Sequence, residues 1–301
     1  MSIRTLLLVF AALVPAVVLC IYVYKHDKVE KEPVWLLLLL LVLGALSCFP
    51  VGEAEGFVIG KITDIFRPFD VSPGDGTIHL SNVTYRLYNA ARYFIGVALL
   101  EELGKWIILV AVTRKSKHFN SLFDGLIYSV FVSLGFAGLE NIMYVTRYGW
   151  MTAYARAFTA VPGHMFFGVL MGYWYSMWHM HSKARGVESL LISIGKIDGG
   201  RKPFPTKRYA VFSLVAPVIA HGLYDYCCTI DTKLAVVAFY VVVSSLYIYC
   251  FGKIWNMSDT DVSAGTYTSY LVNKKYPELS ARSSDEAREK EAEAAQWGAR
   301  V

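Results

Sequence analysis

The sequence predicts an all-α fold: a polytopic membrane helix bundle of about seven transmembrane helices. Hydrophobic residues make up 55% of the 301 residues and charged residues only 18%, which is low for a soluble domain. The apolar residues also occur in blocks of about 20, the length that crosses a hydrocarbon core of ~30 Å. This composition excludes an ordinary soluble enzyme, a disordered chain and a fibre.

The apolar blocks define the spans in chain order. They are residues 5–24, 34–50, 92–113, 121–144, 157–180, 209–230 and 234–255. Residues 56–66 are apolar but too short to cross, so we expect an interfacial helix there. Turn residues at 72–76 indicate that residues 51–91 form one substantial loop. The first block lacks the small residue before Cys20 that a lipoprotein signal needs, so we expect it to be retained as a span.

The charges of the loops predict the orientation. Lysine and arginine are concentrated in the first, third and fifth loops, which are residues 25–33, 114–120 and 181–208. Such loops face the cytoplasm, so the N-terminus lies outside and the C-terminus inside. Residues 1–255 then form the membrane domain, and residues 256–301 form a polar cytoplasmic tail whose run at 284–295 is a solvated helix or disordered. Because orientation explains the basic residues, we expect no nucleic-acid partner.

Ionisable and amide side chains lie inside or at the edge of four predicted spans, where a charge costs roughly 2.5–3.5 kcal/mol on insertion scales. In chain order they are Glu101, Glu102, Lys105, Glu140, Asn141, Arg156, His164, His221 and Asp225. Lys105 lies within one turn of both Glu101 and Glu102. At 1.5 Å per residue, Glu101, His164 and His221 come to similar depths, about 12–14 Å below the outer boundary. We therefore expect one polar pocket in the outer leaflet.

Three interpretations of this pocket remain open: a catalytic or ligand site, a proton or ion relay, and a structural ion-pair network. A proton- or ion-coupled transporter would use the buried carboxylates as a relay. No internal repeat of the transporter kind is visible, and the cytoplasmic halves of spans three to six are almost purely apolar. Peptide hydrolysis needs a base for water, donors for the oxyanion and a donor for the leaving amine, and this set supplies all three.

Four short motifs in this region resemble those of the PrsW family of bacterial intramembrane proteases, in the same order. They are Glu101-Glu102-x-x-Lys105, Phe136-x-x-x-Glu140-Asn141, Pro162-Gly163-His164 with Gly168 and Gly172, and His221-Gly222-Leu223-Tyr224-Asp225. The resemblance covers about residues 92–228. The type II CAAX prenyl endopeptidases and bacteriocin-processing proteases are distantly similar, but they have histidine in place of Glu140 and asparagine in place of Asp225. Both departures favour the PrsW branch.

The resemblance implies an intramembrane endopeptidase in the bacterial cytoplasmic membrane, whose partners are single-span membrane protein substrates, such as anti-sigma factors, and the lipid bilayer. It also implies that Glu101 and Glu102 carry the catalytic role. We expect Glu101 to be the base, and His164 and His221 to donate to the oxyanion or the leaving group. Asp225 would orient His221. The supporting residues would be Lys105, Glu140, Asn141 and Arg156.

Zinc is the alternative to metal-free chemistry. Glu140, His164 and His221 are acceptable zinc ligands, and Glu101 or Glu102 could then activate a metal-bound water. No HExxH motif is present, however, and ligands from three helices cannot be verified by spacing. We therefore favour a glutamate-type protease that requires no cofactor.

Overall fold

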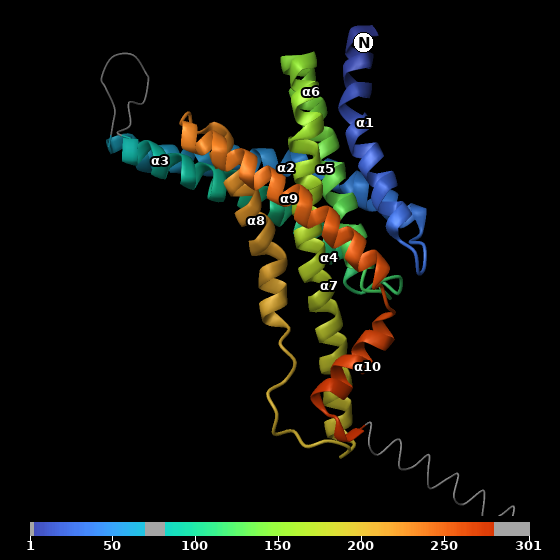
Figure 1. Cartoon of the computed structure of the whole chain (residues 1–301). Helices are drawn as coiled ribbons and strands as arrows, with labels where there is room; N and C mark the ends of the chain where they lie inside the picture. The colour runs from blue at the N-terminus through green and yellow to red at the C-terminus, as the bar shows by residue number, and fades with distance from the viewer. Residues whose placement is uncertain (1–2, 70–81, 280–301) are drawn as a thin grey trace, which may run out of the picture.

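The computed structural model describes residues 3–69 and 82–279, and within these ranges the chain is helical without a β-sheet (Figure 1). The helices are α1 (Ile3–His26), α2 (Val34–Phe66), the short η1 (Arg67–Phe69), α3 (Asn82–Ala91), the π-helical η2 (Arg92–Ala98), α4 (Leu99–Thr113), α5 (Asp124–Tyr148), α6 (Trp150–Phe158), α7 (Ala160–Ser193), α8 (Lys207–Thr229), α9 (Lys233–Asp259) and α10 (Ala264–Lys275). Five of these described helices, α1, α2, α5, α8 and α9, are long and apolar enough to cross a membrane. The all-α membrane class is confirmed, whereas the number seven and the orientation stay predictions.

Helix α5 forms the centre of the bundle. Every residue from Ser121 to Gly138 is buried, and α1, α2 and α7 pack around this helix. A helix that is apolar on all sides faces either lipid or other helices, and here other helices enclose it. The motif residues that α5 carries are therefore fixed by packing from several sides.

Helices α2 and α5 cross at two glycines. A Cβ atom at Gly44 would lie 2.1 Å from the carbonyl oxygen of Val132, and one at Gly135 would lie 2.0 Å from that of Leu41. No side chain fits at either position, so glycine is what allows the two backbones to touch. The pairing also shows that α2 and α5 are antiparallel where they cross.

The segment expected to be a loop, residues 51–91, is helical in its described parts, which are residues 51–69 and 82–91. Helix α2 continues through Pro50 as one helix of 33 residues, so the interfacial helix predicted at 56–66 is its last part. The tight packing of Val51 beyond the proline holds the helix together, as neighbouring helices do at prolines in membranes. The turn predicted at 72–76 lies outside the described residues.

The packing of α2 against η2 and α4 has a defined register. A Cβ atom at Gly104 would lie 2.6 Å from Cγ2 of Val51, and one at Gly96 would lie 2.8 Å from Cγ1 of Ile59. From Val51 to Ile59 the residue numbers rise along α2, while the residues they contact fall from Gly104 to Gly96, so α2 is antiparallel to the η2–α4 segment. Glu55 lies midway between Val51 and Ile59, so along the helix axis it is at the height of Leu100, the residue before Glu101.

Two predicted spans are divided in the structure. Residues 92–113 comprise the π-helical η2 followed by α4. Gly149, whose φ of 86° suits glycine, separates α5 from the short α6. The predicted span 157–180 is divided at Thr159, between α6 and α7, and α7 extends well beyond the predicted end at residue 180. Single π-helical turns often occur at functional sites, and this one ends just before the Glu101-Glu102 pair.

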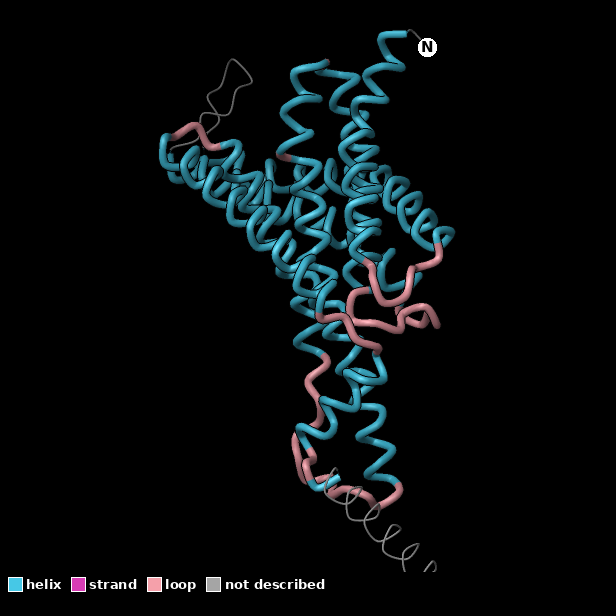
Figure 2. Tube along the Cα trace, turned by 45° about the vertical axis from the view of Figure 1, so that its right-hand side comes forward, coloured by secondary structure: helices cyan, strands magenta, loops and turns pink. Residues whose placement is uncertain are grey.

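The first part of the predicted tail is folded onto the bundle. Helix α10 packs against the end of α7, where the buried Glu188 accepts hydrogen bonds from the Tyr276 hydroxyl (2.6 Å) and from Lys275. The N-terminus and α10 lie at opposite ends of the molecule (Figures 1 and 2). The run at 284–295 lies outside the described residues.

Candidate active site

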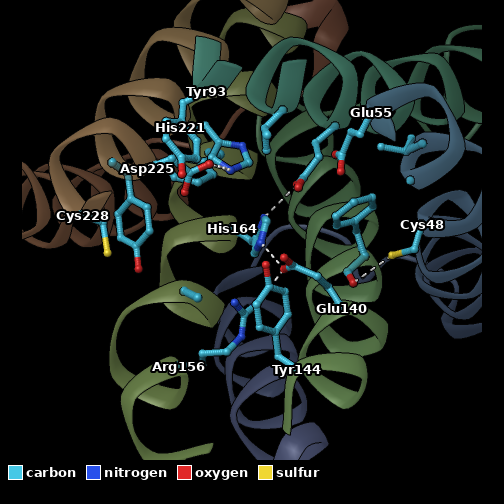
Figure 3. Close-up of a pocket in the computed structure, with 18 of the residues that line it drawn as sticks. Cys48, Glu55, Tyr93, Glu140, Tyr144, Arg156, His164, His221, Asp225 and Cys228 are labelled. Carbon is cyan, nitrogen blue, oxygen red and sulfur yellow. Dashed lines mark hydrogen bonds and ion pairs between the residues drawn. The ribbon is translucent and has the colours of Figure 1, made fainter. Parts of the chain in front are cut away.

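A cavity of about 570 Å³ lies between α2, η2, α4, α5, α6, α7 and α8 (Figure 3). The ionisable side chains of aspartate, glutamate, histidine and arginine that line it are Glu55, Arg92, Glu101, Glu140, Arg156, His164, His221 and Asp225. Glu102, Lys105 and Asn141 are fully buried behind this lining. The structure thus brings together all nine residues that the sequence singled out, and it adds Glu55 and Arg92.

Lys105 lies at the centre of the polar cluster. Its ammonium group donates to Oε2 of Glu101 (3.1 Å) and to Oε1 of Glu102 (2.7 Å), and it lies 3.0 Å from Nδ1 of His164. An ammonium group can only donate, so Nδ1 of His164 accepts and the ring carries its proton on Nε2. This Nε2–H group donates to Oε2 of Glu140 at 2.9 Å. One lysine therefore sets the tautomer and the orientation of His164.

His221 lies between two carboxylates. Its Nδ1 is 2.9 Å from Oε1 of Glu102, and its Nε2 is 3.3 Å from Oδ2 of Asp225, which is one turn further along α8. The ring also stacks on Phe167, with 4.6 Å between the ring centroids. These contacts fix the plane of the imidazole ring at the wall of the cavity.

Arg156 joins the other end of the cluster to α1. Its guanidinium donates to Oε2 of Glu140 (2.6 Å) and to Oδ1 of Asn141 (2.9 Å). Asn141 in turn donates to the backbone carbonyl of Ala12 (2.8 Å). Asn141 does not line the cavity, so it positions Arg156 and does not contact a bound molecule directly.

The two adjacent glutamates have different surroundings. Glu101 lines the cavity, whereas Glu102 is fully buried and does not. Oε1 of Glu102 contacts Lys105 and His221, and its Oε2 has no hydrogen-bond partner among the described residues. Glu101 can therefore meet a water molecule in the cavity, while Glu102 holds Lys105 and His221 in place.

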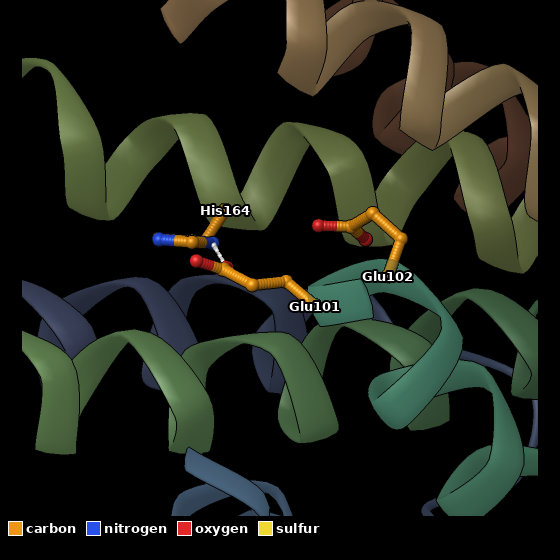
Figure 4. A group of neighbouring side chains, drawn as sticks. All are labelled: Glu101, Glu102 and His164. Atoms are coloured by element: carbon orange, nitrogen blue, oxygen red, sulfur yellow. Dashed lines mark ion pairs between the residues drawn. The ribbon is translucent and has the colours of Figure 1, made fainter. Parts of the chain in front are cut away.

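A metal site has donors of a suitable kind here. Glu101, Glu102 and His164 each offer a ligand atom, and these atoms lie within 4.8 Å of one another (Figure 4). Two carboxylates and an imidazole fit zinc by type. The set differs from the predicted one of Glu140, His164 and His221, since His221 is held between Glu102 and Asp225. Lys105 contacts all three clustered side chains, so it would have to move before an ion could bind among them.

The sequence alone missed several cavity residues. They are Glu55, Arg92, Tyr93 and Tyr144. Glu55 was placed in a loop because Pro50 and the charges after it resemble the end of a span. The repeat of Val51, Glu55 and Ile59 at four-residue spacing, which places these residues on one helix face, was the signal that could have found it.

The fold and the cavity define a multi-pass membrane protein with a buried site of carboxylates and imidazoles. The chain belongs to the PrsW family: the family described as PrsW family intramembrane metalloprotease matches residues 32–251. The resemblance noted from the four motifs is thereby confirmed. Membership makes the protein a peptidase of the intramembrane type.

Individual relatives agree with this assignment. The chain is 31% identical over 222 residues to Protease PrsW of Geobacillus kaustophilus, an alignment that covers 73% of this chain and 78% of that protein. It is 29% identical over 245 residues to Protease PrsW of Bacillus subtilis, with 81% and 92% covered. For Protease PrsW of Oceanobacillus iheyensis the identity is 28% over 216 residues, with 72% and 80% covered. No solved structure matches the chain.

Proposed function

We propose that this protein is an endopeptidase of the bacterial cytoplasmic membrane that cleaves single-span membrane proteins with a water activated by Glu101. The observation that carries the proposal is the contrast within the Glu101-Glu102 pair, in which only the first carboxylate faces the cavity. The cavity volume of about 570 Å³ lies in the usual range of ligand sites. It can receive a short extended piece of a substrate chain.

The reaction uses Glu101 twice. The carboxylate takes a proton from water, and the resulting hydroxide adds to the carbonyl carbon of the scissile bond. The tetrahedral oxyanion then collapses, the C–N bond breaks, and Glu101 returns the proton to the leaving nitrogen. His164 and His221 line the same cavity, and in this structure their Nε2 atoms face the carboxylates of Glu140 and Asp225. To serve as donors for the oxyanion, these N–H groups turn from the carboxylates toward it, and Asp225 orients His221 before that step.

The position of the cavity near one end of the bundle indicates on which side of the membrane substrates are cut. Tyr144 and Arg156 of the cavity belong to the end of α5 and to α6, and these elements pack against the first half of α1 through Leu8 and Ala12. With the N-terminus outside, this is the extracytoplasmic end. Substrates are then cut near their extracytoplasmic side, as anti-sigma factors would be.

A zinc-dependent reaction is the second candidate, because the grouping of Glu101, Glu102 and His164 favours it. These three side chains would hold the ion, which would act as a Lewis acid and lower the pKa of a bound water. Lys105 would have to release them first. We favour the metal-free form because the ammonium group already provides positive charge to the same three side chains.

The proposal is tested with Glu101→Ala and His221→Ala, each produced together with a tagged single-span substrate. We expect both variants to lose cleavage while their protein level in the membrane is kept. The matched control is Glu53→Ala, which removes an exposed carboxylate of α2 and should cleave normally. Unchanged cleavage in both site variants would remove the protease assignment of this cavity.

A further inference from the structure

Glu55 is the one cavity carboxylate that no motif contains. It lies on α2, level with the residue before Glu101, because Val51 packs on Gly104 and Ile59 packs on Gly96. Figure 3 shows its carboxylate directed into the cavity from the α2 side, opposite the wall that carries Asp225. The side chain is half-buried, so a bound molecule can reach it.

The other cavity carboxylates all have a cationic or imidazole partner. Lys105 contacts Glu101, Arg156 and His164 contact Glu140, and His221 contacts Asp225. Glu55 has no hydrogen bond and no ion pair with any residue in the described ranges. A partly desolvated carboxylate without a partner is unfavourable, and a positive group brought by a ligand relieves this cost.

Two other uses of Glu55 fit the geometry less well. It does not belong to the donor group of Glu101, Glu102 and His164, so it is not placed to share an ion with them. It also forms no hydrogen bond to Glu101 within the described ranges, where the Glu101 carboxylate accepts from Lys105, so it is not placed to pass a proton to Glu101 directly. What the geometry leaves at this position is a carboxyl group without a partner in the described ranges, at the edge of the reaction site.

We propose that Glu55 binds the side chain of a lysine or arginine in the substrate, next to the scissile bond. The inference rests on the proposed protease function and adds a substrate preference to it. A basic side chain would enter along the α2 wall and pair with Glu55, while the backbone beside it reaches Glu101. Glu55 is then a specificity residue, and the reaction itself still depends on Glu101.

The test uses purified protein in detergent and a series of single-span substrates that differ at one position. Lysine, glutamine or glutamate is placed in turn at each residue around the cleaved bond, and kcat/KM is measured for each. We expect wild type to prefer lysine over glutamine about tenfold or more at one position, the size of effect that a hydrogen bond to a charged group gives. Glu55→Gln should remove this preference for lysine. Glu55→Arg should reverse it, so that the substrate with glutamate at that position is cleaved best.

The outcomes separate the two proposals. The matched control, Glu53→Gln, changes an exposed carboxylate two residues away and should keep the wild-type preference. Equal loss for the lysine, glutamine and glutamate substrates in Glu55→Gln would overturn the specificity role, and so would a preference that Glu55→Arg leaves unchanged. Wild type that cleaves no substrate of the series would instead contradict the protease function itself.

Discussion

The ammonium group of Lys105 lies 2.7 Å from Oε1 of Glu102, and both side chains are fully buried. Neither charge reaches water, so each depends on the other for its stabilisation. The same lysine contacts Glu101 and His164, and the same glutamate contacts His221. The pair therefore connects α4, α7 and α8 and also orients the groups that face the cavity.

Removing one member of this pair should destabilise the protein strongly. Lys105→Met leaves Glu102 as a buried charge without its cation, and we expect the free energy of unfolding to fall by about 3–5 kcal/mol. Unfolding in detergent, followed by circular dichroism, measures this change. The double variant Lys105→Met with Glu102→Gln should recover part of the loss, because the fully buried charge of Glu102 is removed together with its cation and only Glu101 is left without Lys105.

The matched control for the Lys105 and Glu102 variants is Lys61→Met, which removes an exposed ammonium group on α2. It should leave the unfolding transition within about 0.5 kcal/mol of wild type, as surface substitutions usually do. A Lys105→Met variant as stable as this control would contradict the role of the buried pair.

The sequence predicted the helices and the motif residues better than it predicted the connections. Buried charges such as Glu101 and His221 are costly in a membrane, so their presence alone indicated a shared polar site. The continuation of α2 past Pro50 depends on Gly96 and Gly104, which lie some 40 to 50 residues further along the chain. Such a long-range contact leaves no local pattern, so Pro50 and the charges after it predicted the end of a span, although the repeat of Val51, Glu55 and Ile59 was a local sign that the helix continues.

The crossing of α2 and α5 gives a second stability prediction. Gly135→Ala places a Cβ atom 2.0 Å from the carbonyl oxygen of Leu41, where the obstacle is backbone and cannot rotate away. Overpacking of this kind costs typically about 1–3 kcal/mol, and we expect a loss of that size in the free energy of unfolding. Gly52→Ala is the control, since a Cβ atom there meets nothing within 4 Å. Equal stability of the two variants would show that the helices do not touch at Gly135.

Two buried carboxyl groups in the loop between α1 and α2, those of Asp27 and Glu32, should make the stability of the protein depend on pH. Burial is the main cause that raises the pKa of Glu32 from 4.5 to about 8, and nearby Asp27 has its pKa raised to about 6 for the same reason. The folded protein therefore holds protons that the unfolded chain releases at lower pH. Stability contributed by these groups is complete below about pH 4 and is lost as the pH rises toward 8.

Thermal unfolding at pH 6 and pH 9 measures this effect. We expect wild type to be less stable at pH 9, and Glu32→Gln, which carries no charge at either pH, to show a smaller difference. Tyr128, which donates to Oε2 of Glu32 at 2.5 Å, can donate to the amide oxygen of the variant as well. Glu30→Gln removes an exposed carboxylate of the same loop and should behave like wild type. A pH dependence that survives unchanged in Glu32→Gln would place its origin elsewhere.

The position of Lys105 also predicts the response to metal removal. Its ammonium group contacts Glu101, Glu102 and His164, the three side chains that would otherwise hold an ion. We therefore expect purified enzyme to keep its cleavage rate within about twofold after dialysis against a strong chelator, and to contain far less than one zinc per chain, because a zinc site needs these ligands free. A rate lost on chelation and restored by added zinc would instead show that Lys105 leaves the cluster and that the three side chains bind the metal.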